Sequence, residues 1–543
     1  MGNISTRLNE KANPNEMLFN WYKLAKTSHN KIDRNVHGLT FSNSTKARLS
    51  NCLHFFDAES SIHFTVNPLL GKLILLSLLP EEEAEAYISD IAATATLPEL
   101  FDAIENHSKL TRYLRQLATP LPAGDESDVQ KCELMMYGNL ECNLKCPYCN
   151  SLKARMKADR GEAPRLMPME TTRQGVRFIA ERTAGRARQI SVNFSLGGEP
   201  LLSFDRYRQL REFCGEVTEE TGIPITLSLN TNGTAFTEEF IEYCEANGVA
   251  MAVSIDGPRD IHDSMRVFKS GKGSYDAIAE SLPRILGSEC PGLSHAVGGA
   301  VLTALNPRPR EVYRHLIELG FRMVVVTPVR DLPDREWSLN ARTVESFKQG
   351  YAEYAEWMAD RLAAEDDSIY AAMNEHDFFA RFLIRVIRRT KNAYRCEAGR
   401  NNFGVGVDGG LYPCDSFIGM EEFRLGDVFS GVDSEMQAEF LRDTMVDEKP
   451  ICRDCWARYL CGGGCYYAAA LANRDHLIPH SAKCDLTRRL IELSIWILTE
   501  LRGRNPHALQ RLVDSVFRSE SPVVFPIPRE SDSIPVSTVT DAH

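Results

Sequence analysis

The residues of this 543-residue chain that are best suited to chemistry are cysteines, and three of them form a short run. Cys142, Cys146 and Cys149 have the spacing C-x3-C-x2-C. Three core cysteines on one helical face would also fit this spacing, but Pro147 is unfavourable inside a helix. A four-iron cluster normally takes four thiolates, so three thiolates would leave one iron open to another ligand. A structural zinc site would need four protein ligands, and no fourth Cys or His follows closely.

Seven further cysteines gather towards the C-terminal end of the chain. They are Cys396, Cys414, Cys452, Cys455, Cys461, Cys465 and Cys484. The four from 452 to 465 have the spacing C-x2-C-x5-C-x3-C. Two zinc sites and two iron–sulfur clusters are both compatible with seven thiolates. The isolated cysteines, at positions 52, 132, 214, 244 and 290, lie mostly in apolar patterns and are interpreted as packing residues.

Composition limits the class of protein. The chain is 43% hydrophobic and 25% charged, as is usual for globular proteins, and its net charge of -12 disfavours non-specific nucleic-acid binding. No apolar run is long enough for a membrane span. The first thirteen residues are polar and lack the apolar core of a signal peptide, so we expect a cytoplasmic protein with neither nucleic-acid nor membrane partners. In that compartment, 15 cysteines indicate metal or redox chemistry rather than disulfides.

Alternating strand and helix signals predict the elements that must position the first three cysteines. Candidate strands are 132–140, 189–196, 225–231, 249–255, 295–303 and 322–328. Candidate helices between them are 171–184, 204–221, 238–247, 275–286 and 310–319, each followed closely by a glycine. Six such units predict a parallel, TIM-like but partial (β/α)6 barrel in an α/β fold. The first cysteine run follows the first strand, at the end where parallel sheets carry their sites.

The remaining regions divide by composition. We expect a polar arm over 1–44 with one helix near 16–26, a small α/β accessory domain over 45–125, and a barrel core over 130–335. A helical connection over 336–395, a Cys-rich domain over 396–485, C-terminal helices over 486–519 and a disordered tail over 520–543 follow.

The first cysteine run and the motifs behind it resemble the radical SAM superfamily. In that family the triplet holds a [4Fe–4S] cluster whose open iron binds S-adenosylmethionine (SAM), and one electron then releases a 5′-deoxyadenosyl radical. The resemblance implies that Tyr148 lies near the adenine. It further assigns SAM binding to Gly197, Gly198, Glu199, Asn230, Ser254 and Arg266. Glu199 would accept from the SAM ammonium, while Ser254 and Arg266 are candidates for its carboxylate.

The second cysteine field resembles the SPASM extension of the same superfamily, which holds two auxiliary [4Fe–4S] clusters. The resemblance implies that Cys452, Cys455, Cys461 and Cys484 bind one cluster, while Cys396, Cys414 and Cys465 bind the other. This makes three clusters in total. Cys290 is the nearest upstream cysteine, over a hundred residues away, so we expect the three-cysteine cluster to carry either an open iron or a non-cysteine ligand. Asp415 follows Cys414 and occupies the position of a catalytic base in several relatives; a turn-capping role is the alternative.

The resemblance implies a peptide- or protein-modifying maturase, most similar to enzymes that form thioether crosslinks, including the quinohemoprotein amine dehydrogenase maturases. Residues 45–125 would bind a leader segment of the substrate, and a flavodoxin or ferredoxin would donate electrons. An anaerobic sulfatase-maturing enzyme that makes formylglycine is the second reading. A non-enzymatic zinc- or cluster-bearing scaffold or electron-transfer protein is the third.

Overall fold

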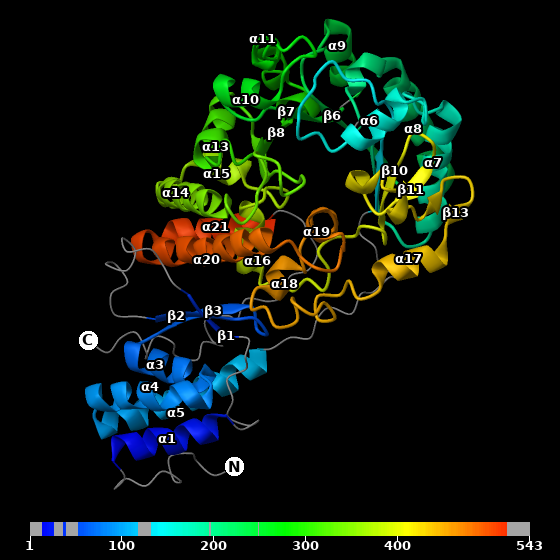
Figure 1. The fold of residues 1–543 in the computed structure, drawn as a ribbon. Coiled ribbons are helices and arrows are strands. Elements are labelled where there is room, and N and C mark those ends of the chain that lie inside the picture. The colour runs from blue at the N-terminus through cyan, green and yellow to red at the C-terminus, as the bar shows by residue number, and fades with distance from the viewer. Residues whose placement is uncertain are drawn as a thin grey trace.

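Six parallel strands form the barrel core, which lies in the upper part of Figure 1. The computed structural model describes residues 13–26, 36–39, 53–117, 132–194, 197–247 and 249–518. The strands are β4 (Cys132–Met136), β5 (Ile190–Asn193), β6 (Ile225–Thr231), β7 (Ala250–Ser254), β8 (Val297–Leu302) and β9 (Met323–Pro328). They pair in chain order and in parallel. The predicted partial barrel is confirmed.

Helices connect these strands across the outside of the sheet. The long ones are α7 (Met169–Thr183), α8 (Phe204–Thr221), α9 (Glu238–Asn247), α11 (Tyr275–Leu286) and α13 (Pro309–Glu318), all within two residues of their predicted bounds. The short ones are α6 (Leu152–Asp159), α10 (Arg259–Met265), α12 (Pro291–Ser294) and the 3-10 turn η2 (Pro200–Ser203). Helix α8 ends at Gly222, whose φ of 71° is the left-handed conformation that favours glycine at a helix end.

The Cys-rich region continues the barrel sheet. Strand β10 (Asn402–Val405) pairs in parallel with β4, and β11 (Gly410–Tyr412), β12 (Gly426–Asp427) and β13 (Gly431–Val432) follow in antiparallel order. Within the described residues this gives one ten-stranded sheet from β13 to β9. The short helices η3 (Asp415–Phe417), η4 (Glu421–Phe423), α17 (Ser434–Leu441), α18 (Arg458–Cys461) and α19 (Tyr466–Asn473) complete this region. Residues far apart in sequence therefore share backbone hydrogen bonds.

The opposite edge of the sheet, β9, is covered by a connecting segment. Asp377 Oδ2 accepts from the Val326 N–H at 2.9 Å, and the Phe378 N–H donates to the Val326 carbonyl at 3.2 Å. Asn374 Nδ2 donates to the Val324 carbonyl at 2.9 Å. This segment thus satisfies backbone groups that an open edge would leave for another strand.

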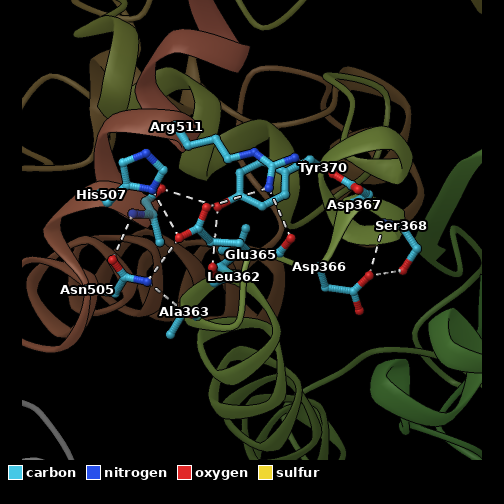
Figure 2. A network of polar contacts seen from close by, with 11 residues as sticks. Leu362, Ala363, Glu365, Asp366, Asp367, Ser368, Tyr370, Asn505, His507 and Arg511 are labelled. Carbon is cyan, nitrogen blue, oxygen red and sulfur yellow. Dashed lines mark hydrogen bonds and ion pairs between the residues drawn. The ribbon is translucent and has the colours of Figure 1, made fainter.

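Five helices pack beside that edge: α14 (Val344–Ala363), α15 (Asp367–Ala372), α16 (Ala380–Arg388), α20 (Ser481–Arg504) and α21 (Pro506–Arg518). Figure 2 shows the polar contacts that fix α21 to the turn between α14 and α15. Asn505 Nδ2 donates to the Ala363 carbonyl at 2.9 Å, and Arg511 donates to the Glu365 carbonyl at 3.0 Å. The Arg511 guanidinium also lies 4.4 Å from the Tyr370 ring centre. No helix in the described part of the chain is long and apolar enough to cross a membrane.

The accessory domain contains a helix that the sequence placed in a polar arm. Helix α1 (Pro14–Ala25) packs on α3 (Pro68–Leu78), α4 (Glu81–Thr94) and α5 (Leu97–Leu117) through Leu18 and Trp21, both buried. These helices lie beside a sheet of β1 (Val36–Leu39), β2 (Leu53–Asp57) and β3 (Ile62–Val66). The rest of the expected arm, Cys52 and the expected tail over 520–543 lie outside the described residues.

The turn between β2 and β3 docks against the Cys-rich region. Glu59 Oε1 lies 2.5 Å from Arg458 Nη2, and Glu59 Oε2 lies 3.3 Å from Lys391 Nζ. Both cations are buried, with side-chain exposures of 5% and 1%. Phe56 packs edge-on against Trp456, between two of the C-terminal cysteines. The accessory domain therefore contacts the wall of a cysteine-lined site.

Candidate active site

The first three predicted cysteines line one cavity at the carboxyl ends of the barrel strands. This central cavity has a volume of about 310 Å³ and contains Cys142, Cys146 and Cys149 in its lining. The other predicted SAM-site residues in the lining are Tyr148, Gly197, Gly198, Glu199, Asn230, Ser254 and Arg266. Burial raises the pKa of the Cys146 thiol to about 12. Without a bound cation, such a thiol stays protonated at neutral pH, so a metal centre would have to displace its proton.

The loop Gly197-Gly-Glu-Pro200 packs directly on the cysteine loop. A Cβ at Gly198 would lie 2.3 Å from the Glu141 carbonyl oxygen, so only glycine fits this approach. The approach lets the Glu199 N–H donate to that carbonyl at 2.8 Å. Sequence reasoning placed these glycines against a ligand, whereas the structure also places them against the backbone that carries Cys142.

Glu199 is held by the end of β6. Its Oε1 accepts from Thr231 Oγ1 and its Oε2 accepts from the Asn232 N–H, both at 2.7 Å. Burial raises the pKa of Glu199 to about 7, although these hydrogen bonds act in the opposite direction. A carboxyl in this environment is poised to become fully ionised when an ammonium group binds beside it.

Tyr148 and Arg266 meet at Asp256, which the sequence motif Ser254-Ile-Asp-Gly-Pro258 contains but which was not singled out. The Tyr148 hydroxyl donates to Asp256 Oδ2, and the Val301 N–H donates to Asp256 Oδ1 at 3.0 Å. Arg266 Nε lies 3.1 Å from Asp256 Oδ1. Asp256 is 2% exposed. One buried carboxylate thus orients two of the predicted ligand-binding side chains.

Asp415 reaches the central cavity from the Cys-rich region. It begins η3, and the pairing of β10 with β4 brings that region alongside the barrel. Ser416 Oγ lies 3.4 Å from Asp415 Oδ2. Arg330, two residues after β9, lines the same cavity and was missed because a single arginine after a strand carries no motif. Burial alone would lower the pKa of Arg330, but Cys465, Asp415 and Cys414 raise it overall.

Four of the C-terminal cysteines surround a second cavity. Cys452, Cys455, Cys461 and Cys484 line this small cysteine cavity, whose volume is about 40 Å³. Cys484 lies in the first turn of α20. The turn Gly462-Gly-Gly464 after Cys461 has φ values of 76°, 92° and 79°, which only glycines adopt without strain. The sequence grouped these four cysteines, and the structure brings them together.

The last three cysteines, Cys396, Cys414 and Cys465, influence one another's pKa. Burial raises the pKa of Cys414 well above its usual range, and Asp415, Cys465 and Cys396 add to the rise. Cys465 differs: burial would raise its pKa, but Lys483 and Arg330 lower it to about 7. Cys290 lies elsewhere, with its Sγ 3.6 Å from the Cys244 carbonyl oxygen.

Comparison with known proteins identifies the core. A family model described as the radical SAM superfamily matches residues 140–327. Those residues form a radical SAM domain. The match begins two residues before Cys142 and ends within β9. It therefore includes every residue that lines the central cavity except Pro328, Val329, Arg330 and Asp415. The match indicates an enzyme of radical chemistry, and the family implies a [4Fe–4S] cluster and SAM as its cofactors.

The characterised relatives of this chain are maturation enzymes. A cysteine-type anaerobic sulfatase-maturating enzyme of Clostridium novyi is 24% identical over 60% of this chain and 84% of its own length. A serine-type enzyme of Klebsiella aerogenes is 25% identical over 65% of this chain and 84% of its own length. An uncharacterised protein of Archaeoglobus fulgidus is 27% identical over 70% and 84%.

Solved structures share the fold. One described as anSMEcpe with bound AdoMet has a TM-score of 0.55 at 18% identity, covering 71% of this chain and 99% of that chain. Another, with bound AdoMet and a Cp18Cys peptide, has a TM-score of 0.53 at the same identity. The two cover nearly identical shares of this chain, and both support the partial barrel.

The thiols of the radical SAM domain fit the cluster that the family implies. Three thiols face one cavity whose remaining lining supplies a carboxylate, a guanidinium and apolar side chains, which match the ammonium, carboxylate and adenine of SAM. Within the described residues, no group of three or more His, Cys, Asp or Glu is arranged to hold a single metal ion. The thiols instead surround open space, which a four-iron cube requires.

Proposed function

We propose that this protein is a radical SAM maturase that acts on a peptide or small protein and forms an intramolecular crosslink, either a thioether or a C–C bond. The observation that carries the proposal is the place of Asp415, in the lining of the cavity that contains Cys142, Cys146 and Cys149. A substrate carbon in this cavity would share it with both a hydrogen-abstracting centre and a carboxylate. That carboxylate can take the proton that crosslinking releases.

The chemistry balances for a thioether. One S–H bond and one C–H bond break, and one S–C bond forms. The hydrogen atom leaves in 5′-deoxyadenosine, and Asp415 takes the thiol proton. The remaining electron leaves to an iron–sulfur acceptor, which is the chemistry that the C-terminal cysteines would supply when loaded.

The number and grouping of the C-terminal thiols favour two auxiliary [4Fe–4S] clusters in addition to the SAM-binding one. Four thiols around one cavity match a fully ligated cluster, and Cys396, Cys414 and Cys465 match a cluster with one open position. A substrate thiolate is a suitable ligand for that position. Three clusters predict about twelve irons per chain after anaerobic reconstitution, measured by elemental analysis.

The test compares wild type with Asp415→Asn. The loaded protein receives SAM, dithionite and synthetic Cys-containing peptides, and products are measured by chromatography and mass spectrometry. The variant is expected to cleave SAM and to lose at least about a hundredfold in peptide product, as for loss of a general base. Asp408→Asn, on the same region but paired with Arg424, is the control. Full product from Asp415→Asn would overturn the role of Asp415.

Formylglycine formation is the second candidate, and the sulfatase-maturating relatives favour it. The two products differ in whether the cysteine sulfur is retained. A crosslink from cysteine loses two hydrogens, keeps the sulfur and resists fragmentation between its anchor points. Formylglycine made from cysteine loses the sulfur altogether. Release of sulfide with no crosslink would therefore replace the first proposal with the second.

We also propose that the accessory domain binds a leader segment of the substrate. In the described part of this domain, β3 pairs on one side only, with β2, so its other edge offers backbone groups to an added strand. The edge of β9, by contrast, is satisfied by residues 374–378. Deletion of residues 1–125 should abolish peptide binding and retain SAM cleavage. Unchanged peptide affinity would contradict this role.

A further inference from the structure

A second surface depression includes Cys142 in its lining. This outer hollow has a volume of about 520 Å³, and its lining includes Cys142, Arg165, Leu202, Phe268 and Lys269. Cys142 also lines the central cavity. Cys142 is therefore shared by the linings of the central cavity and the outer hollow.

The floor of the outer hollow is rigidly joined to the cysteine loop. Leu144 and Phe268 form an antiparallel bridge. The Lys145 N–H donates to the Val267 carbonyl at 2.9 Å, and the Lys269 N–H donates to the Asn143 carbonyl at 3.0 Å. A partner that rests on this loop would thus be held close to the cysteine triplet.

The rim of the hollow is positive, although the whole chain carries a net charge of -12. Lys269 lines the hollow, and the backbones of Lys145 and Lys272 bond to Val267 and Phe268 beside it. All three lysines are exposed, and none of the ion pairs in the described part of the chain includes them. Arg165 is paired with Asp159 at 2.8 Å, and Glu141 is the acidic residue in the lining. Three unpaired lysines on an acidic protein select an acidic partner by long-range attraction.

An apolar centre lies inside this rim. Leu202 is 46% exposed and Phe268 is partly exposed. An apolar centre with a charged rim is the usual anatomy of a protein–protein contact. The surface outside the small cysteine cavity differs: Ile451 is exposed there, but its charged neighbours Arg453 and Asp454 lie 3.6 Å apart and offset each other.

We propose that the outer hollow is the docking surface for a small acidic electron-carrier protein. The inference rests on the proposed radical SAM chemistry, which needs one electron for each SAM cleaved. The carrier is oxidised by one electron, the centre that Cys142, Cys146 and Cys149 would hold is reduced, and no bond or proton is exchanged between the two proteins. The lysines around the hollow would orient the carrier, and Cys142 would link the hollow to that centre.

The test measures binding of a bacterial flavodoxin to the loaded full-length protein by calorimetry at low salt. Lys269→Glu/Lys272→Glu should weaken binding by about tenfold or more, because reversed rim charges repel an acidic partner. The difference should shrink in about 1 M salt, where the Debye length is about 3 Å. Glu141→Lys should act in the opposite direction and tighten binding. Arg453→Glu, beside the small cysteine cavity, is the matched control.

Activity separates this proposal from the proposed function. With dithionite, which needs no docking surface, the double lysine variant should form 5′-deoxyadenosine as fast as wild type, whereas with reduced flavodoxin it should be slower. Absence of 5′-deoxyadenosine from wild type with dithionite would contradict the proposed function and leave the binding measurement to decide the docking surface. Flavodoxin affinity that is unchanged in the double lysine variant, or lowered only by Arg453→Glu, would overturn the docking surface.

Discussion

The central cavity and the small cysteine cavity present the same kind of sulfur atom in different surroundings. The first contains three cysteines and has a volume of about 310 Å³, whereas the second contains four and has a volume of about 40 Å³. Three thiols with room beside them suit a centre that must exchange a ligand. Four thiols with little room suit a centre that stays closed.

The two cavities also differ in how they are built. Strand ends and their loops carry the polar lining of the central cavity, as is usual for sites in parallel sheets. A glycine turn, a short helix and the first turn of α20 carry the small cavity. In the central cavity, individual side chains are positioned for a ligand. In the small cysteine cavity, backbone turns surround the cysteine sulfurs. The difference teaches that thiol number and free space together separate a reactive centre from a permanent one.

The largest expected effect follows from removing each thiol set in turn. Cys142→Ala/Cys146→Ala/Cys149→Ala should reduce 5′-deoxyadenosine formation to the uncatalysed background, because no open centre remains to bind SAM. Cys452→Ala/Cys455→Ala should retain SAM cleavage and lose peptide product. Each variant should lose about four irons. Chromatography of 5′-deoxyadenosine and iron analysis measure these outcomes.

The comparison of the two cavities would fail if both variants lost SAM cleavage equally while keeping the iron of the other sites. It would also fail if the first variant still cleaved SAM. Cys214→Ala, which changes a buried packing cysteine, is the control for cysteine loss without a site.

A smaller effect is expected from the buried carboxylate of the central cavity. Asp256→Asn removes the charge that faces Arg266 and weakens the acceptor of the Tyr148 hydroxyl. Because hydrogen bonds to charged groups contribute about 1.5–3 kcal/mol, we expect SAM affinity to fall by about tenfold or more. Equilibrium dialysis measures the SAM affinity of the variant and of wild type.

Tyr148→Phe sharpens this prediction. It removes one contact to Asp256 and keeps Arg266 paired, so its loss of SAM affinity should be smaller than that of Asp256→Asn. A larger loss of SAM affinity in Tyr148→Phe than in Asp256→Asn would show that Asp256 does not organise the site.

The smallest expected effect concerns the wall of the small cysteine cavity. Arg458 lines that cavity, and Glu59 of the accessory domain pairs with it and with Lys391. Glu59→Gln leaves two buried cations with less compensation. Because Glu59 is itself 30% exposed, we expect the free energy of unfolding to fall by about 1–3 kcal/mol rather than by the full value for a buried pair. Denaturant titration measures it.

Glu162→Gln, which breaks an exposed pair with Arg160, should leave stability unchanged. If Glu59→Gln behaved in the same way, the accessory domain would not support the small cavity. SAM cleavage should be unaffected in both variants, since neither residue touches the central cavity.

The sequence predicted the barrel because most of the strands are continuous runs of Val, Ile, Leu and Ser, and each of the five predicted helices is followed closely by a glycine. It also grouped the cysteines, since their spacing is local. It did not reveal Asp256 as an organiser, because a carboxylate between two ligand-binding residues has no spacing of its own. Nor did it reveal the pairing of β10 with β4. Asn402–Val405 is short and irregular, and its partner lies more than two hundred residues earlier.

That pairing has a consequence for synthesis of the chain. Glu133 and Asn402 are 269 positions apart, so at about 5–20 residues per second the partner of β4 leaves the ribosome roughly 13–54 seconds after it. During that interval one flank of β4, immediately before the cysteine run, has no neighbouring strand. The nascent protein therefore passes through a stage in which the first three cysteines are made but Asp415 has not yet joined the lining of their cavity, and a chaperone or cluster-delivery protein has this interval in which to reach the thiols.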